Sequence, residues 1–339
     1  MSTRRHILAV VCVSTAFIFE MPKLRAEDKP QTGAESSANS TAPAGPQAEK
    51  YQLTFKFRPN QVLRYEVLSE TEISTKARDE IEIQRNSTKT KRHHRVAAID
   101  EKSGDADLEL SIDWVSMRAI WDKRDGTTPV PIEFQSDDPN KQPGKFKHIL
   151  ASVGKPWATI RFQPTGSPLK VVMTAVQSAE PKGLVTDTGA DGALEAYLIV
   201  LPEHPVAVGQ SWTEKKFDVI ALDEHRNRNL IAIQRVYKLT EVKAGRATIE
   251  LKTMILSPVT NPAIASQLLL REVGGKITFD VERGLILSKE WTVQNTVVNP
   301  IPGVTSLMKG SYRYSEKLTA EEQAPERVVK GGADTTSKK

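Results

Sequence analysis

The histidines offer the broadest chemistry in this sequence, because an imidazole can bind a metal or move a proton near neutral pH. His93 and His94 are adjacent, and adjacent side chains of a strand point to opposite faces, so the two cannot bind one metal. His204 stands between a glutamate and a proline, as a loop residue does. The others are scattered: His6, His148 and His225. No pair has the His-x-x-x-His spacing of a helix face, so we expect no metal site and no cofactor.

Ser152 and Lys155 fit the Ser-x-x-Lys pattern of penicillin-recognising enzymes. That chemistry needs the serine at a helix start and an unprotonated lysine one turn later. Here Gly154 and Pro156 end a helix instead, and no Lys-Thr-Gly follows. Because nucleophile elbows, phosphate loops and dinucleotide fingerprints are also missing, the sequence predicts no catalytic residue. We expect a protein that is not an enzyme.

The densest charge lies in residues 85–95, where five cations and two histidines occur in eleven residues. One interpretation is a basic patch for acidic polysaccharide or anionic lipid head groups. The favoured one is an edge strand that Lys and Arg protect from pairing with other chains. The acidic run 66–82 is expected in the preceding strand, paired with this one. Glu109 and Glu250 are expected on outward faces, in solvent.

The overall charge does not indicate a nucleic-acid partner. Lys and Arg number 47 against 42 Asp and Glu, a net charge of +5, and the first 26 residues hold much of the excess. The remaining body is only mildly basic, so no nucleic acid is expected as a partner.

Residues 1–26 read as a secretory signal peptide, with Arg4 and Arg5 before an apolar run over 7–19 and cleavage near Ala26. The run is too short to cross a bilayer, so we expect export to the periplasm or beyond without a stable transmembrane anchor. Cys12, the single cysteine, leaves with this peptide, so the mature chain is expected to have no disulfide or thiolate site.

Three further segments follow the signal peptide. Residues 27–50 and 319–339 are rich in small, polar and charged residues and predict a disordered linker and tail. Residues 51–318 alternate apolar and polar side chains over runs of five to seven, with glycines at the turns between them. This pattern predicts a mainly β (α+β) domain of antiparallel strands. Helices are expected at 146–153, 192–201 and 264–273, and a long loop at 122–144.

The domain carries signs of an internal duplication. Residues 95–110 and 235–251 share Arg-Val, a glycine turn and a final Glu-Leu, and matching pieces precede and follow each. Three pieces in the same order predict two repeats, about 51–180 and 192–318. The matched positions are apolar residues and turn glycines, so they indicate shared architecture and no shared active site.

The run Leu-Pro-Glu-His-Pro-Val-Ala-Val-Gly-Gln-Ser-Trp (201–212), followed by Gly-Lys-Ile-Thr-Phe-Asp-Val-Glu-Arg-Gly-Leu-Ile (275–286), resembles exported bacterial proteins of unknown function that are common in planctomycetes. These are similar to the periplasmic lipoprotein-carrier architecture. The resemblance implies a curved antiparallel half-barrel, with helices across its open side and an apolar groove. It brings no catalytic residue.

Two functions are expected from these observations. The first is an exported, non-enzymatic protein that binds a lipid or other apolar ligand in a groove on the curved sheet. The alternative is a structural or envelope-interaction protein without a small ligand. Tryptophan positions do not separate them, because a groove and a core use the same side chains: Trp114, Trp121, Trp157, Trp212 and Trp291.

Overall fold

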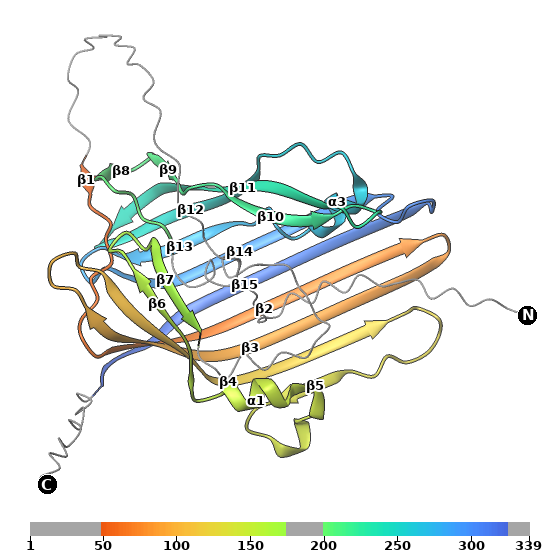
Figure 1. Ribbon diagram of the computed structural model, residues 1–339, viewed down its shortest axis with the longest axis horizontal. Coiled ribbons are helices and arrows are strands. Elements are labelled where there is room, and N and C mark those ends of the chain that lie inside the picture. Colours follow the sequence, from red (N-terminus) through yellow and green to blue (C-terminus); the bar gives the residue numbers. More distant parts are fainter. Residues whose placement is uncertain (1–48, 174–198, 325–339) are drawn as a thin grey trace, which may run out of the picture.

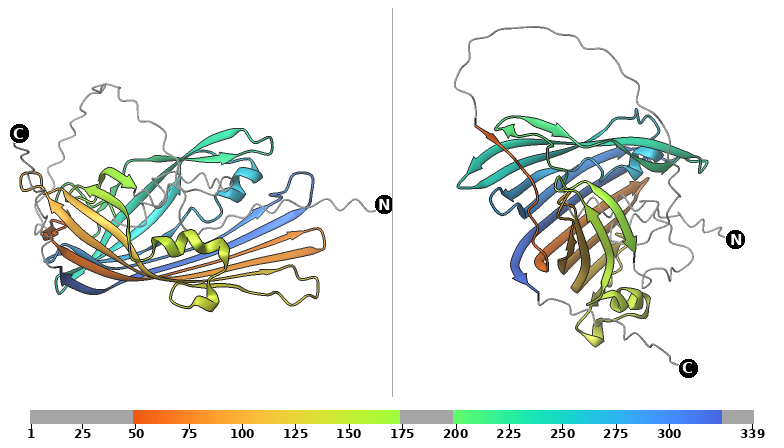
Figure 2. Two further views of the ribbon diagram at one scale, coloured as in Figure 1. Left: turned by 60° about the horizontal axis from the view of Figure 1, so that its bottom comes forward. Right: turned by 60° about the vertical axis from the view of Figure 1, so that its left-hand side comes forward.

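A computed structural model describes residues 49–173 and 199–324. The predicted signal peptide, nearly all of the predicted linker and the last residues of the predicted tail lie outside these ranges. The described part is one large curved antiparallel sheet that does not close into a barrel (Figures 1 and 2), accompanied by a few short helices. The predicted fold class is confirmed.

The sheet has thirteen strands, and neighbours in space are mostly neighbours in sequence. Its spatial order is β10 (Phe217–Leu222), β11 (Arg228–Lys243), β12 (Arg246–Ile255), β13 (Gly274–Asp280), β14 (Leu285–Val298), β15 (Ser306–Gln323), β2 (Gln61–Ala77), β3 (Glu80–Ile99), β4 (Ala106–Asp122), β6 (Pro156–Phe162) and β7 (Pro168–Met173). Short strand β5 (Ile132–Gln135) adds to β4, and β9 (Ser211–Thr213) adds to β11. A separate pair joins β1 (Lys50–Tyr51) to β8 (Val206–Ala207).

The two halves follow one order of elements. In each, a long hairpin leads through a short helix into a second hairpin: β3–β4, α1 (Lys147–Ser152) and β6–β7, then β11–β12, α3 (Pro262–Gln267) and β13–β14. The expected helix at 146–153 matches α1, whereas α3 is shorter than the expected 264–273. The 122–144 region is not wholly a loop, because it holds β5 and the 3-10 turn Pro139–Lys141.

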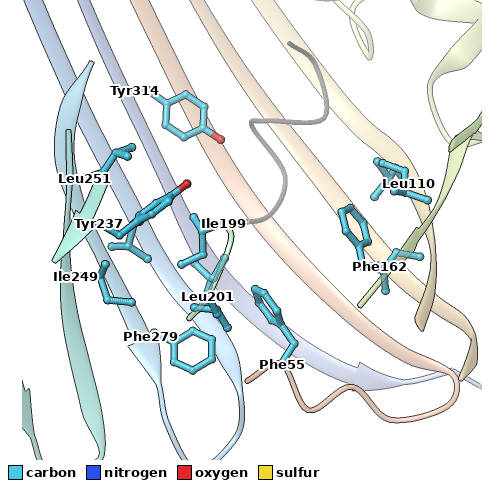
Figure 3. Close-up of a cluster of buried hydrophobic side chains, with 14 of the residues drawn as sticks. Phe55, Leu110, Phe162, Ile199, Leu201, Tyr237, Ile249, Leu251, Phe279 and Tyr314 are labelled. Atoms are coloured by element: carbon cyan, nitrogen blue, oxygen red, sulfur yellow. The ribbon is translucent and has the colours of Figure 1, made fainter. Parts of the chain in front are cut away.

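The third expected helix, 192–201, lies mostly outside the described residues. Its last part, 199–201, is not helical. Ile199 and Leu201 instead pack with Phe55 between the two arms of the sheet, with Tyr237, Ile249 and Phe279 on one side and Leu110 and Phe162 on the other (Figure 3). The Phe55 and Leu201 amides donate to carbonyls of the β6–β7 turn, which holds these segments in place, and the apolar core closes this end of the curved sheet.

Two sequence expectations about strands are wrong. The basic segment 85–95 is no edge, because β3 pairs with β2 on one side and β4 on the other. The predicted tail boundary at 319 is also too early, since β15 continues to Gln323 and pairs there with the start of β2. Polar residues 319–323 enter the sheet because their backbone bonds and ion pairs stabilise them without apolar burial: Glu322 lies 2.9 Å from the Arg64 Nε atom.

Candidate functional site

The face of the sheet that bears the core, the inner face, extends beyond that core along the longest strands. Cross-strand register defines its rows, because residues directly opposite in a sheet point to the same side. One row runs Trp291, Tyr314, Ser69, Thr88 and Met117 across β14, β15, β2, β3 and β4. The next runs Val293, Tyr312, Thr71, Asn86 and Ala119. Both rows are apolar at their ends and bear hydroxyl or amide groups in the middle.

Two helical connections flank these rows. On one side the turn after α3 lies on β15, where a Cβ on Gly310 would come within 2.5 Å of Leu269. The Asn295 amide donates to the Leu269 carbonyl at 3.0 Å. On the other side Phe134 of β5 contacts Phe146 of the turn before α1, with the rings tilted and their centres 5.2 Å apart. The resemblance implied helices across the open side of the sheet, whereas these connections lie at the flanks of the two rows.

A buried ion cluster lies on the inner face beside the core. Glu316 accepts hydrogen bonds from Arg92, Tyr314 and Lys289, with the Lys289 Nζ–Oε1 distance 2.9 Å. Arg92 also donates to the Tyr314 hydroxyl at 3.1 Å. The Lys289 and Glu316 side chains are each 1% exposed and that of Arg92 is 9% exposed. Three charged groups therefore lie within the apolar interior.

Burial lowers the pKa of Lys289 in this cluster and of His94 near it. It lowers the pKa of Lys289 to about 8, although the Glu316 carboxylate acts in the opposite direction. His94, which contacts the Tyr65 ring at 5.0 Å between centres, has a pKa well below its usual value. The main cause is burial, followed by the charges of Arg92 and Lys289. His94 is therefore a neutral imidazole at pH 7.

A second polar cluster lies on β11 and the residue after β9. Glu214 accepts a hydrogen bond of 2.9 Å from the Tyr237 hydroxyl and lies 3.5 Å from Arg235. Burial raises the pKa of the Glu214 carboxyl, and Arg235 and Tyr237 partly offset that rise. In both clusters the buried polar groups are thus bonded to one another.

The opposite, outer face carries a shallow hollow of about 810 Å³. Two adjacent cross-strand rows of that face form most of its lining, and their charges alternate: Thr292, Arg313, Glu70, Ser87, Arg118 and Gln294, Ser311, Glu72, Arg85, Ile120. Arg85 Nε lies 2.6 Å from Glu72. Both side chains are more than two-fifths exposed, so this pair is an ordinary surface ion pair.

Comparison with known proteins assigns no family. No family model matches the chain, and no curated protein matches it. A structure of lipovitellin, reported for its lipid–protein interactions, is similar at a TM-score of 0.45 and 14% identity. That match covers 80% of this chain and 26% of lipovitellin, so this chain spans about a quarter of the lipovitellin chain. A DUF1329 family protein from Desulfovibrio piger is similar at a TM-score of 0.15 and 9% identity. That match covers 77% of this chain and 86% of the other. Pseudomonas aeruginosa OccK7 (OpdD) is similar at a TM-score of 0.23 and 7% identity. That match covers 78% of this chain and 99% of the other.

These likenesses are too distant to carry a ligand or an activity over to this chain. No helix among the described residues is long and apolar enough to cross a membrane. Within 49–173 and 199–324, no group of three His, Cys, Asp or Glu side chains gathers where a metal ion would bind.

The candidate residues from the sequence do not come together in one place. His93 and His94 do point to opposite faces: His94 is buried, and His93 Nδ1 lies 2.7 Å from Asp113. His204 lies exposed in a loop, and His225 is exposed in the β10–β11 turn. Ser152 ends α1 and donates to the Ile149 carbonyl, with Lys155 beyond the helix.

The acidic and basic side chains lie closer to where the sequence predicted them. Acids of β2 do face the basic segment, as Glu72 pairs with Arg85 and Glu66 lies 3.8 Å from Lys91. Glu250 is exposed as expected. Glu109 is not in free solvent, because it lies 3.2 Å from Arg95 with its side chain only 18% exposed.

The sequence reasoning missed the ion cluster of Arg92, Lys289 and Glu316. The signal was present in the alternation itself: Lys289 has the same parity along β14 as Trp291 and Val293, both of which point inward. A charged residue at an inward position of a strand indicates a buried partner on a neighbouring strand.

Proposed function

We propose that this chain is an exported, non-enzymatic protein that binds an amphipathic ligand, an acyl chain with a polar head, on the inner face between α1 and α3. One observation carries the proposal: each inner row places polar side chains on β2 and β3, three hydroxyls and the Asn86 amide in all, between apolar side chains on β14 and β4. Ser69 bonds the Tyr312 side chain, but a purely apolar ligand would offer these polar groups no partner of its own. Each buried polar group left unpaired costs about 1–3 kcal/mol.

The surroundings support a ligand of this kind. Val115 and Val293 are buried on either side of the hydroxyl-bearing strands, and Met117 is half-buried. On the β4 side they continue the core of the closed end, since Val115 belongs to it and Met117 packs against it. An acyl chain lying over them gains apolar burial of about 25 cal/mol for each Å² removed from water.

The test is native mass spectrometry of the exported form, recovered after secretion and expected to begin at Glu27, before and after organic extraction. We expect a co-purified mass that extraction removes, and uptake of a fluorescent fatty acid by the extracted protein. A clean mass with no uptake would refute the proposal and favour the structural or envelope-interaction role.

A matched pair of variants locates the ligand. Met117 and Ser116 are neighbours on β4 that face opposite sides of the sheet, so Met117→Lys places a charge on the inner face and Ser116→Lys places it on the outer one. We expect Met117→Lys to weaken fatty-acid binding about tenfold or more, as a loss of about 1.4 kcal/mol would. Ser116→Lys should leave it within a factor of two of wild type, and equal losses would show that the ligand does not lie on the inner face.

A further inference from the structure

Exposed large apolar side chains gather at one end of the sheet. Ten occur among the described residues, and seven of them lie in or beside the connections at that end: Ile81, Trp121, Val130, Ile132, Leu230, Leu256 and Val298. Scattered exposed apolar residues are ordinary on a protein surface, but a concentration of them marks an interaction site.

The topology explains why these residues share an end. Because the sheet is antiparallel throughout, the connections that follow β2, β4, β10, β12 and β14 all lie at the same end of their strands. In Figure 1 this end is on the right, opposite the closed end where Phe55 and Leu201 pack. We call it the open rim, comprising residues 78–81, 121–132, 223–230, 256–261 and 298–305.

The β14–β15 connection is the most apolar part of the open rim. Residues 298–305 read Val-Asn-Pro-Ile-Pro-Gly-Val-Thr and contain no charged residue. Val298 is 63% exposed. On a neighbouring connection Trp121 is 46% exposed, with the Lys123 Nζ atom 5.8 Å from its ring centre. An amphipathic indole beside a lysine that reaches toward water is typical of a membrane–water interface.

The charges of the other connections nearly cancel. Residues 121–132 and 223–230 each contain two Asp or Glu and two Lys or Arg, and residues 78–81 contain two acids and one base. A surface of this kind is not attracted to anionic lipids by net charge, and it is not repelled by them either. Its affinity for a membrane must come from apolar side chains that enter the head-group region.

We propose that the open rim docks onto a lipid bilayer through its apolar side chains, independently of lipid charge. Val298 and Trp121 enter the head-group region, and the balanced charges of the neighbouring turns stay in water. A bilayer suits this rim because separate apolar tips on several connections can each insert, without the continuous complementary surface that a folded partner needs. The proposal does not rest on a bound ligand, so it can fail or hold separately from the proposed function.

The test is co-sedimentation of the exported form with phosphatidylcholine vesicles and with vesicles that also contain phosphatidylglycerol. We expect binding to both, within about a factor of two of each other and little changed by salt. Binding confined to the anionic vesicles and abolished by salt would overturn the proposal in favour of charge-driven adsorption. Failure to bind either kind of vesicle would also overturn it.

Variants then locate the contact. Val298→Asp and Trp121→Asp should each weaken binding about tenfold, since each loses an inserted apolar side chain. Val208→Asp is the matched control, because Val208 is 49% exposed in the β8–β9 turn, away from the open rim. Val298→Ser checks the result with a smaller, uncharged change, and unchanged melting temperatures show that the variants fold. An equal loss in Val208→Asp would refute docking through the rim, while fatty-acid binding should stay at the wild-type level in both Val298 variants.

Discussion

Replacing Glu316 tests the physical account of the buried ion cluster. Glu316→Gln keeps the shape of the side chain but removes the one carboxylate that accepts from both Arg92 and Lys289. The two cations then stay close together inside the protein, where removal of one partner of a buried ion pair costs about 3–5 kcal/mol. We expect the free energy of unfolding to fall by about that amount.

Lys289→Met should cost much less than Glu316→Gln. The methionine fills similar space, and Glu316 retains its bonds from Arg92 and Tyr314. The lowered pKa of Lys289 shows that burial disfavours its charge more strongly than Glu316 stabilises it. Removing that charge should therefore change stability by about 1 kcal/mol or less, in either direction. The double variant should be more stable than Glu316→Gln alone, because it holds one buried cation fewer.

Urea unfolding at pH 7 measures these differences, and a pH series adds an independent check. The pKa of Lys289 is about 8 when folded and 10.5 in a free side chain, so between these values the unfolded chain holds more protons. Wild-type stability should gain a contribution that rises with pH across this window, and Lys289→Met should lack it. Equal costs for Lys289→Met and Glu316→Gln, or the same pH slope in both proteins, would refute the reasoning.

Three further outcomes are expected. Gly275→Ala should destabilise the protein by about 1–3 kcal/mol in thermal or urea unfolding, because its Cβ would lie 2.0 Å from the Glu290 carbonyl oxygen, whereas Gly144→Ala, with open space around it, should change stability little. Acidification below pH 6.5 should destabilise the fold by up to about 1.4 kcal/mol per pH unit through His94, because the imidazole binds a proton in the unfolded chain but stays neutral when buried. His94→Leu should flatten that part of the curve of unfolding free energy against pH. Arg85→Ala, which removes an exposed ion pair with Glu72, should cost less than about 1 kcal/mol in urea unfolding.

The antiparallel sheet could be predicted because burial alternates along its strands. In β12, for example, Ala247, Ile249 and Leu251 point inward and are buried, while Arg246, Glu250 and Lys252 are exposed. A period of two in the sequence is a direct record of a strand with one buried face. The glycine turn at 244–245 was likewise visible, and both residues have positive φ angles.

The position of a strand within the sheet could not be predicted in the same way. Lys and Arg in residues 85–95 look like protection for an edge, but Glu66 and Glu72 of β2 face them and make a central strand acceptable. Residues 319–323 look disordered because they are polar. They are ordered by pairing with β2 and by Glu321, which binds both Arg58 and Arg283. Both errors arise from partners far away in the sequence.

The placement of β15 beside β2 has a consequence for how the protein is made. The middle of the sheet joins Gln61–Ala77 to Ser306–Gln323, so its central pairing waits until β15 has been synthesised, long after β2. Until then β2 and β14 each present an unpaired edge, which is open to wrong pairing with other chains. Pairings this distant in sequence also form slowly. A nascent or truncated chain that stops before residue 306 should therefore aggregate, and a chaperone that shields strand edges should matter most for this protein during its synthesis.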